Sequence, residues 1–279
     1  MFQRPTSGSI VCPNCGRLVG VRDEKCLGCG RSNPGLWGLA PLLNKLGRGF
    51  GFTEVVIAGC SGLFLITLLL SGSGALGGGL FSLLSPGQKT LLQFGASGAV
   101  PVFGHGRWWT VLSAAWLHGG LLHIVMNMLW IRQLMPAVTE FYGVGRVVII
   151  YTVSSAVGFG LTSFMGLLPL PGPLAGAYMT VGASAPLFGL FGALVLYGQA
   201  TGSRMLSRQV WQWVIFFGVF GLIVPFVDNW AHLGGFAGGW LAARWLDPRK
   251  AESPQHLVGA VICLGLTVLS ILVSVLLGL

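Results

Sequence analysis

Ser184 and His232 are the two side chains of this sequence whose types and setting point most directly to chemistry. Each opens an apolar stretch, within Gly182-Ala183-Ser184-Ala185-Pro186 and Asp228-Asn229-Trp230-Ala231-His232. An unpaired polar group in hydrocarbon costs roughly 2 to 7 kcal/mol, so we expect the hydroxyl and the imidazole to face each other. An imidazole within about 2.6 to 3.2 Å of a serine hydroxyl can take its proton and activate the oxygen. The pair therefore predicts nucleophilic serine chemistry.

A second polar group lies upstream, in His118-Gly-Gly-Leu-Leu-His123-Ile-Val-Met-Asn127. At 100° per residue, His123 and Asn127 fall about 40° apart on one helical face, one turn from each other. They form a small polar patch with hydrogen-bond donors. His118 points elsewhere, and we expect it to make a structural hydrogen bond to the preceding loop.

The composition places these residues in a membrane protein. Charged residues make up 8% and hydrophobic residues 53%, with a mean hydropathy of +0.78, whereas soluble domains carry about 25% charged residues. The formal net charge of +9 does not predict a nucleic-acid partner, because the basic residues are spread between apolar runs. The lipid bilayer is the expected environment.

Seven stretches approach or exceed the roughly 20 apolar residues that cross a bilayer as a helix. The sequence therefore predicts an all-α polytopic membrane protein. The expected spans are residues 54–72, 109–135, 145–168, 178–200, 209–227, 230–246 and 256–278.

Lys and Arg residues predict the orientation. With the amino terminus in the cytoplasm, 14 of the 16 basic residues fall on that side, and Lys89 and Arg107 fall on the other. The carboxyl terminus is then outside, and Ser184 and His232 begin their spans at the outer face. Because Pro186 is tolerated only in a first helical turn, we expect a helix to begin at Ser184 or Ala185, with free N–H groups that could hold an oxyanion.

The amino-terminal residues 1–34 carry a separate signal, two Cys-x-x-Cys pairs that are each followed by glycine. Gly16 and Gly30 can adopt the positive φ of a tight knuckle, and four thiolates can enclose a structural Zn²⁺ ion. We expect a small zinc ribbon, followed by a linker or interfacial segment over residues 35–53. The alternative, two disulfides, is disfavoured in the cytosol. The four ligands would be Cys12, Cys15, Cys26 and Cys29.

Small residues at helical spacing accompany the Ser–His pair. Gly235, Gly239 and Ala243 continue the face of His232, and Gly189 and Gly192 follow Ser184. Such residues let two helix backbones approach closely in a membrane. The helices that carry Ser184 and His232 can therefore approach closely enough for these two short side chains to meet.

Taken together, Gly182-Ala183-Ser184, the His118, His123 and Asn127 spacing, and Ala231-His232-Leu-Gly-Gly-Phe resemble the rhomboid family of intramembrane serine proteases. The resemblance covers residues 54–248 and implies a six-helix core. Residues 249–279 would add one carboxyl-terminal span, as in part of the family. The implied substrates are transmembrane segments cleaved near the outer face, without a catalytic cofactor, and the implied location is a bacterial inner membrane.

The resemblance also implies residue roles. Ser184 would be the nucleophile and His232 the general base of a dyad. His123, Asn127 and the backbone N–H of Ser184 would form the oxyanion hole, and Phe188 would pack on the catalytic imidazole. His118, Gly182, Gly235 and Gly239 would support the site.

Three features depart from the family pattern. Ala185 and Pro186 stand where the family usually has glycine after the nucleophile, and the alanine methyl is expected to narrow substrate access. Trp109-Thr110 replaces a Trp-Arg pair and removes a polar tether of the first loop. Gly95-Ala96-Ser97-Gly98 matches the family's GxSG letters better, but it precedes the second span, so we expect it to lie in the outer loop.

The remaining polar residues offer little support for other protease mechanisms. The seven acidic residues include none deep in a span, and no HExxH motif is present, so aspartyl and metalloprotease mechanisms are poorly supported. An inactive rhomboid-like protein that binds transmembrane helices is the alternative to a protease. A cytosolic partner of the zinc ribbon is a further possibility.

Overall fold

The computed structural model describes residues 8–12, 15–34, 51–72, 83–224, 227–250 and 252–278. Most of the linker expected over residues 35–53 lies outside the described residues. The chain divides into two compact units, residues 1–55 and 56–279, and each is considered by itself.

The small unit is built on a two-stranded antiparallel sheet. Strands β1 (Ser9–Val11) and β2 (Leu18–Gly20) pair with Ile10 opposite Val19. Its interior consists of Cys12, Val19 and Cys26, with Ile10 packed against them. A core this small does not stabilise a fold alone, and small domains of this kind usually depend on a metal or disulfides.

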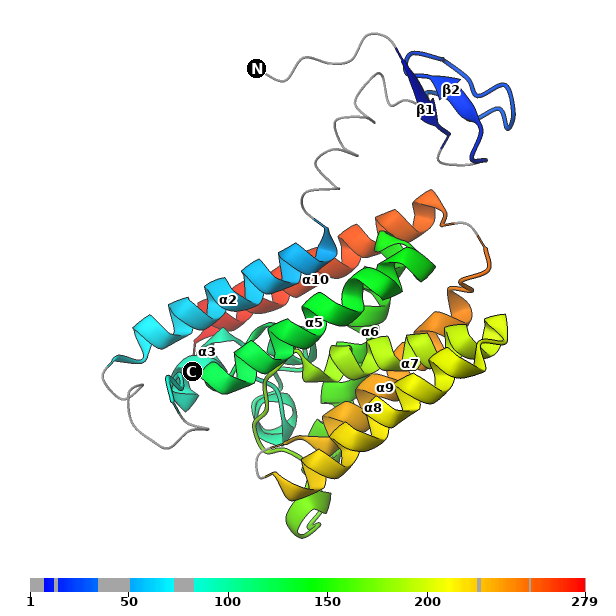
Figure 1. Ribbon diagram of the computed structural model, residues 1–279. Coiled ribbons are helices and arrows are strands. Elements are labelled where there is room, and N and C mark those ends of the chain that lie inside the picture. The colour runs from blue at the N-terminus through cyan, green and yellow to red at the C-terminus, as the bar shows by residue number, and fades with distance from the viewer. Residues whose placement is uncertain are drawn as a thin grey trace. The chain divides into compact units, whose positions relative to one another are not determined.

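The large unit is helical, as expected from the composition (Figure 1). Short helices α3 (Gln88–Phe94) and α4 (Thr110–Ser113) lie between the first two long ones, with the single turns η3 (Val100–Gly104) and η4 (Ala114–Trp116). Another turn, η5 (Gly172–Leu174), follows α6. The longer helices are α2 (Phe52–Leu70), α5 (Leu121–Tyr142), α6 (Val144–Met165), α7 (Ser184–Thr201), α8 (Arg204–Ile223), α9 (Asn229–Trp245) and α10 (Pro254–Leu277).

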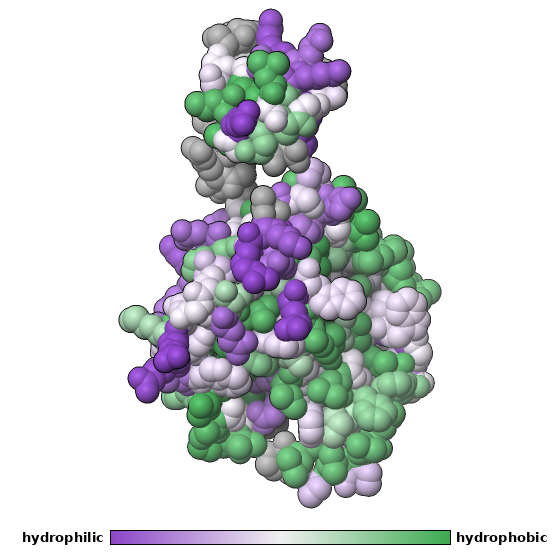
Figure 2. Space-filling model, turned by 90° about the vertical axis from the view of Figure 1, so that its right-hand side faces the viewer, coloured by the Kyte–Doolittle hydropathy of each residue, from purple (hydrophilic) through white to green (hydrophobic). Residues whose placement is uncertain are grey.

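Helices α2, α5, α6, α8 and α10 are long and apolar enough to cross a membrane. Figure 2 shows one face of the chain, on which hydrophobic side chains cover much of the large unit and hydrophilic ones gather toward one end. Helix α7 is different, because most of its side chains are buried against other helices. The structure thus confirms a polytopic helical membrane fold.

Two of the expected apolar stretches become helical later than their first residues. The span expected over 109–135 begins only at Leu121, because Gly120 is extended (φ 174°, ψ 167°) and separates the short α4 and η4 from α5. His118 therefore lies before the helix rather than inside it. The apolar stretch expected over 178–200 becomes helical only at Ser184, one of the two starts expected from Pro186, because Thr180 is held in an extended pairing with Ser97.

Glycines bring α7 and α9 into backbone contact. A Cβ added to Gly239 would collide with the backbone of Gly189, and one added to Gly235 would collide with the carbonyl oxygen of Ala185. Helix α6 joins this packing, because a Cβ on Gly158 would lie 2.7 Å from the Ala231 carbonyl oxygen. Since backbone rather than flexible side chains makes these contacts, the three helices have little freedom to shift.

Candidate active site and metal centre

Ser184 is the first residue of α7, as expected from Pro186. The preceding Gly182 has φ +137°, a conformation that favours glycine, and its N–H donates to the Ala114 carbonyl at 2.9 Å. A Cβ on Gly182 would lie 2.6 Å from His123 Nε2 and 3.7 Å from Ser184 Oγ. The hydroxyl and this imidazole nitrogen therefore flank the same point at the amino end of α7.

His123 presents a donor to that point. The Gly119 N–H donates to His123 Nδ1 at 3.4 Å, so the neutral ring carries its proton on Nε2. Asn127 is buried one turn further along, and its Nδ2 donates to the His123 carbonyl at 2.9 Å. That bond uses one of the two amide hydrogens of Asn127. The polar patch expected on this helix is therefore present, with a donor facing the Ser184 region.

His118 has a structural contact, but its partner differs from the expected one. The Ala183 N–H donates to His118 Nε2 at 3.5 Å, and the His118 ring lies 5.1 Å from that of His123. The fully buried His118 thus contacts the segment directly before Ser184, instead of the loop that precedes His118 in the sequence.

His232 lies in the first turn of α9 and is held by an aromatic stack. Its ring lies 4.1 Å from that of Phe188, at an interplanar angle of 11°. Asp228 caps the same helix by accepting the Ala231 N–H at 3.0 Å. Among the described residues, no hydrogen bond joins the Ser184 hydroxyl to the His232 imidazole. Catalytic hydrogen bonds are often longer before substrate binds, so this geometry is compatible with a dyad that closes on binding.

The Ala185 methyl does not narrow the site as expected. Ala185 is fully buried, and its Cβ lies 3.0 Å from the position that a Cβ on Gly158 would take. The methyl group therefore lies in the packing of α7 against α6. Glycine at position 158 leaves room for alanine after Ser184.

Ser97, the serine of the competing GxSG sequence, is part of the scaffold. It is fully buried, and its backbone exchanges two hydrogen bonds with Thr180, at 3.0 and 2.8 Å. It precedes the second long helix, as expected. No motif or spacing in the sequence indicates that Ser97 pairs with the segment before Ser184.

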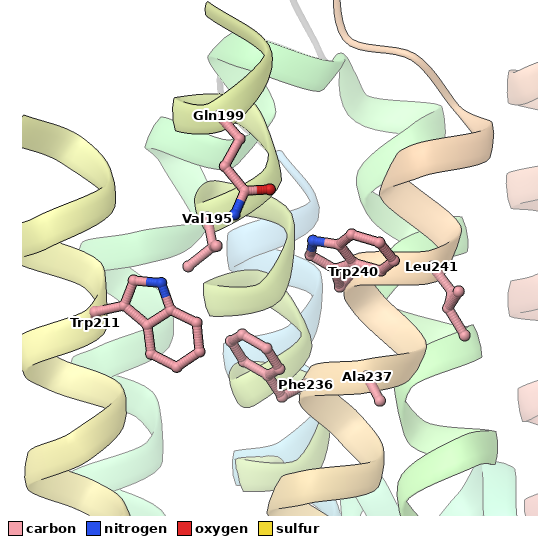
Figure 3. A pocket seen from close by; sticks show the side chains of 7 residues that line it. All are labelled: Val195, Gln199, Trp211, Phe236, Ala237, Trp240 and Leu241. Carbon is pink, nitrogen blue, oxygen red and sulfur yellow. The ribbon is translucent and has the colours of Figure 1, made fainter. Parts of the chain in front are cut away.

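A cavity of about 370 Å³ lies elsewhere, between α7, α8 and α9 (Figure 3). Val195 and Gln199 line it from α7, about 16 to 22 Å along the helix from Ser184. Trp211 lines it from α8, and Phe236 and Trp240 from α9. This apolar groove is separate from the Ser184 region.

The four cysteines of the small unit converge. Their sulfur atoms all lie within 4.8 Å of one another, with Cys12–Cys29 and Cys15–Cys26 separations of 3.8 and 3.6 Å. Four Zn–S bonds of about 2.3 Å in a tetrahedron place sulfurs about 3.8 Å apart, whereas a disulfide needs about 2.05 Å. Gly16 and Gly30 both have φ +73°, as expected for the two knuckles. The cluster could hold a metal ion.

Comparison with known proteins agrees with the motifs. A family model described as the rhomboid domain matches residues 105–249. Rhomboid protease GluP of Bacillus subtilis is 32% identical over 66% of this chain and 35% of its own length. RHOMBOID-like protein 1 of Arabidopsis thaliana is 32% identical over 57% of this chain and 40% of its own length. The putative rhomboid protease YdcA of Bacillus subtilis is 28% identical over 53% of this chain and 71% of its own length.

The chain thus spans about a third to a half of the length of the first relatives it matches. The matched region nevertheless contains the whole set of polar residues around Ser184, from His118 to His232, and the helices that hold them. On this evidence, the chain belongs to the rhomboid family.

Proposed function

We propose that this chain is an intramembrane serine endopeptidase that cleaves transmembrane segments of other proteins. One observation carries the proposal, the arrangement of side chains around Ser184 at the start of α7. The Nε2–H of the neutral His123 ring lies beside Ser184, and Phe188, one turn further along α7, stacks on His232. The relatives named as rhomboid proteases support the same reaction class.

The residues take the following roles in the proposed reaction. His232 accepts the hydroxyl proton as Ser184 Oγ attacks the carbonyl carbon of the scissile peptide bond. The Ser184 N–H, His123 Nε2–H and the free Asn127 amide hydrogen donate to the oxyanion. His232 then gives its proton to the departing amine, and a water molecule hydrolyses the acyl-enzyme by the same steps.

The substrate must expose its backbone to Ser184. A helical peptide bond has its carbonyl engaged within the helix, so we propose single-pass substrates that unwind near the site. The distribution of Lys and Arg favours an amino terminus in the cytoplasm and cleavage near the outer face. A bacterial inner membrane is the proposed location.

The test uses the full chain in lipid, offered a transmembrane substrate and, separately, a fluorophosphonate. We expect Ser184→Ala to abolish both cleavage and labelling, and His232→Ala to reduce both by at least about 10³-fold. Ser97→Ala is the matched control, because it removes the serine of the competing motif and leaves both backbone bonds to Thr180.

If Ser184→Ala and His232→Ala react like the parent, the chain is not a serine protease with this dyad. Binding of the substrate without cleavage by the parent would instead support the inactive, helix-binding alternative.

We also propose that the cysteine cluster binds one structural Zn²⁺ ion, since four convergent thiols suit this metal. The full chain should contain one zinc per molecule by elemental analysis, and Cys15→Ser should lower this content. Unchanged zinc content in that variant would contradict the site. A cytosolic partner for this unit is a separate proposal, and it fails if deletion of residues 1–34 leaves all complexes intact.

A further inference from the structure

The carboxyl-terminal half of α10 is joined to the segment before α5 by three hydrogen bonds. Arg107 Nη2 donates to the Ser274 carbonyl at 2.9 Å, and Trp109 Nε1 donates to Ser274 Oγ at 3.0 Å. Ser270 Oγ donates to the Trp109 carbonyl at 2.7 Å. Arg107, Ser270 and Ser274 are all buried. These buried hydrogen bonds join regions more than 160 residues apart in the sequence.

Arg107 also binds a second helix end, because its Nη1 donates to the Leu92 carbonyl at 2.9 Å. Leu92 and Ser274 lie in the last turns of α3 and α10, where the helix dipole favours a cation. The Leu92 carbonyl also accepts the Gly95 N–H at 3.1 Å, so Arg107 adds a second donor to it. Burial lowers the pKa of the Arg107 guanidinium, but an arginine keeps its charge in proteins. One guanidinium therefore holds two helix ends together.

The contact continues from Arg107 toward Ser184. The Arg107 carbonyl accepts a hydrogen bond from the hydroxyl of Thr110 at 2.8 Å. Thr110 is the first residue of α4, and Ala114 directly follows this helix. Ala114 accepts the Gly182 N–H, and His118 accepts the Ala183 N–H. The segment 107–118 thus supplies both backbone contacts that immediately precede Ser184.

We propose that Arg107 is a positioning residue, through which the carboxyl-terminal helix fixes the segment 107–118 and hence the direction of Ser184. The inference rests on the proposed function. It gives α10 a role in the proposed reaction.

The decisive experiment measures two quantities separately, the fraction of molecules that react at Ser184 and the rate constant of that reaction. The full chain in lipid is reacted with a fluorophosphonate, and both the labelled fraction and the rate constant are recorded. Arg107→Gln should leave the labelled fraction unchanged and lower the rate constant by about 10- to 100-fold, as expected for a displaced nucleophile. Arg107→Lys should recover part of that loss, because an ammonium group still donates hydrogen bonds.

Helix α10 offers a matched pair of variants. Ser270→Ala combined with Ser274→Ala should slow labelling in the same way. Thr267→Ala should label at the parental rate, because the Thr267 hydroxyl donates to Cys263 in its own helix. A parental rate constant in Arg107→Gln, or a loss of labelled sites alone, would overturn the proposal.

Amide hydrogen exchange over residues 177–183 tests the same link without using activity. Exchange should be faster in Arg107→Gln than in the parent, and unchanged in Thr267→Ala. If Ser184 proves unreactive in the parent while exchange responds in this way, the proposed protease activity fails but the link from Arg107 to this segment holds. If the parent reacts and exchange does not respond, the positioning role fails alone.

Discussion

Helix α7 packs against α9 and α8 through different types of residue. Against α9 it presents glycines, and the backbones touch at Gly189 and Gly239. Against α8 it presents rings in the half near Ser184, with Phe188 and Phe191 each about 6 Å from Phe217, and one glycine at the far end, Gly198, which packs on Ser207. Of the described residues of α8, only Val210 and Gly221 are buried. The glycine contact fixes the distance between the helices that carry Ser184 and His232, whereas the aromatic contact can adjust through side-chain rotation.

This difference matters for the proposed reaction. Proton transfer requires the serine oxygen and the imidazole nitrogen to lie about 2.6 to 3.2 Å apart, a range only a few tenths of an ångström wide. Backbone contacts provide such precision, because no rotamer change can relax them. Helix α8 carries no residue of the proposed dyad or oxyanion hole, so its aromatic face has no comparable requirement.

The largest effect is expected where the glycine contact is broken. Gly239→Ala places a methyl group against the backbone of Gly189, so we expect a loss of about 3 kcal/mol in unfolding free energy and little remaining activity. Gly218→Ala on α8 is the matched control, because a Cβ there meets nothing within 4 Å. Thermal unfolding in detergent and the labelling rate of Ser184 provide the two measurements. Equal effects of the two substitutions would remove the distinction between the interfaces.

A smaller effect is expected at the contact of α6 with Ala185. Gly158→Ala should destabilise the fold by about 1 to 3 kcal/mol, because its methyl would approach the Ala185 Cβ and the Ala231 carbonyl oxygen. Adding Ala185→Gly should restore part of the loss by removing one of these contacts. A double-mutant cycle on unfolding free energies measures this coupling. Purely additive effects would show that the Ala185 methyl does not occupy this space.

The smallest effect is expected on the aromatic side. Phe216 of α8 is 57% exposed, and lipid chains can replace its contacts, so Phe216→Ala should cost less than about 1 kcal/mol. The cost is measured by thermal unfolding. A large cost at Phe216 would mean that α8 is held as firmly as α9.

Local sequence signals predicted the ends of several elements well. Pro186 predicted that a helix begins at Ser184, and Gly16 and Gly30 predicted the two cysteine knuckles. These positions depend on steric rules within a few residues of the chain. The start of α5 was missed, because hydropathy continues through Gly119 and Gly120 although the backbone there is extended.

Contacts between distant segments were not predictable in this way. Ala185 was expected to narrow the site, and only the position of Gly158 shows where its methyl lies. Arg107 was counted only as one of two basic residues of the outer side, and its burial against the ends of two helices was not expected. No spacing or motif in the sequence indicates that Gly158 lies beside Ala185, or that the ends of two helices lie beside Arg107.

The sequence by itself determined the membrane class and the four cysteines, and it predicted the Ser184 and His232 pair and the polar patch of His123 and Asn127. Each follows from residue type, local spacing or composition. The tertiary structure alone decided which donors face Ser184, where the Ala185 methyl packs, and that α10 contacts the first loop. The reason is physical: these properties depend on which surfaces meet when helices pack, and residues far apart in the chain determine that outcome together.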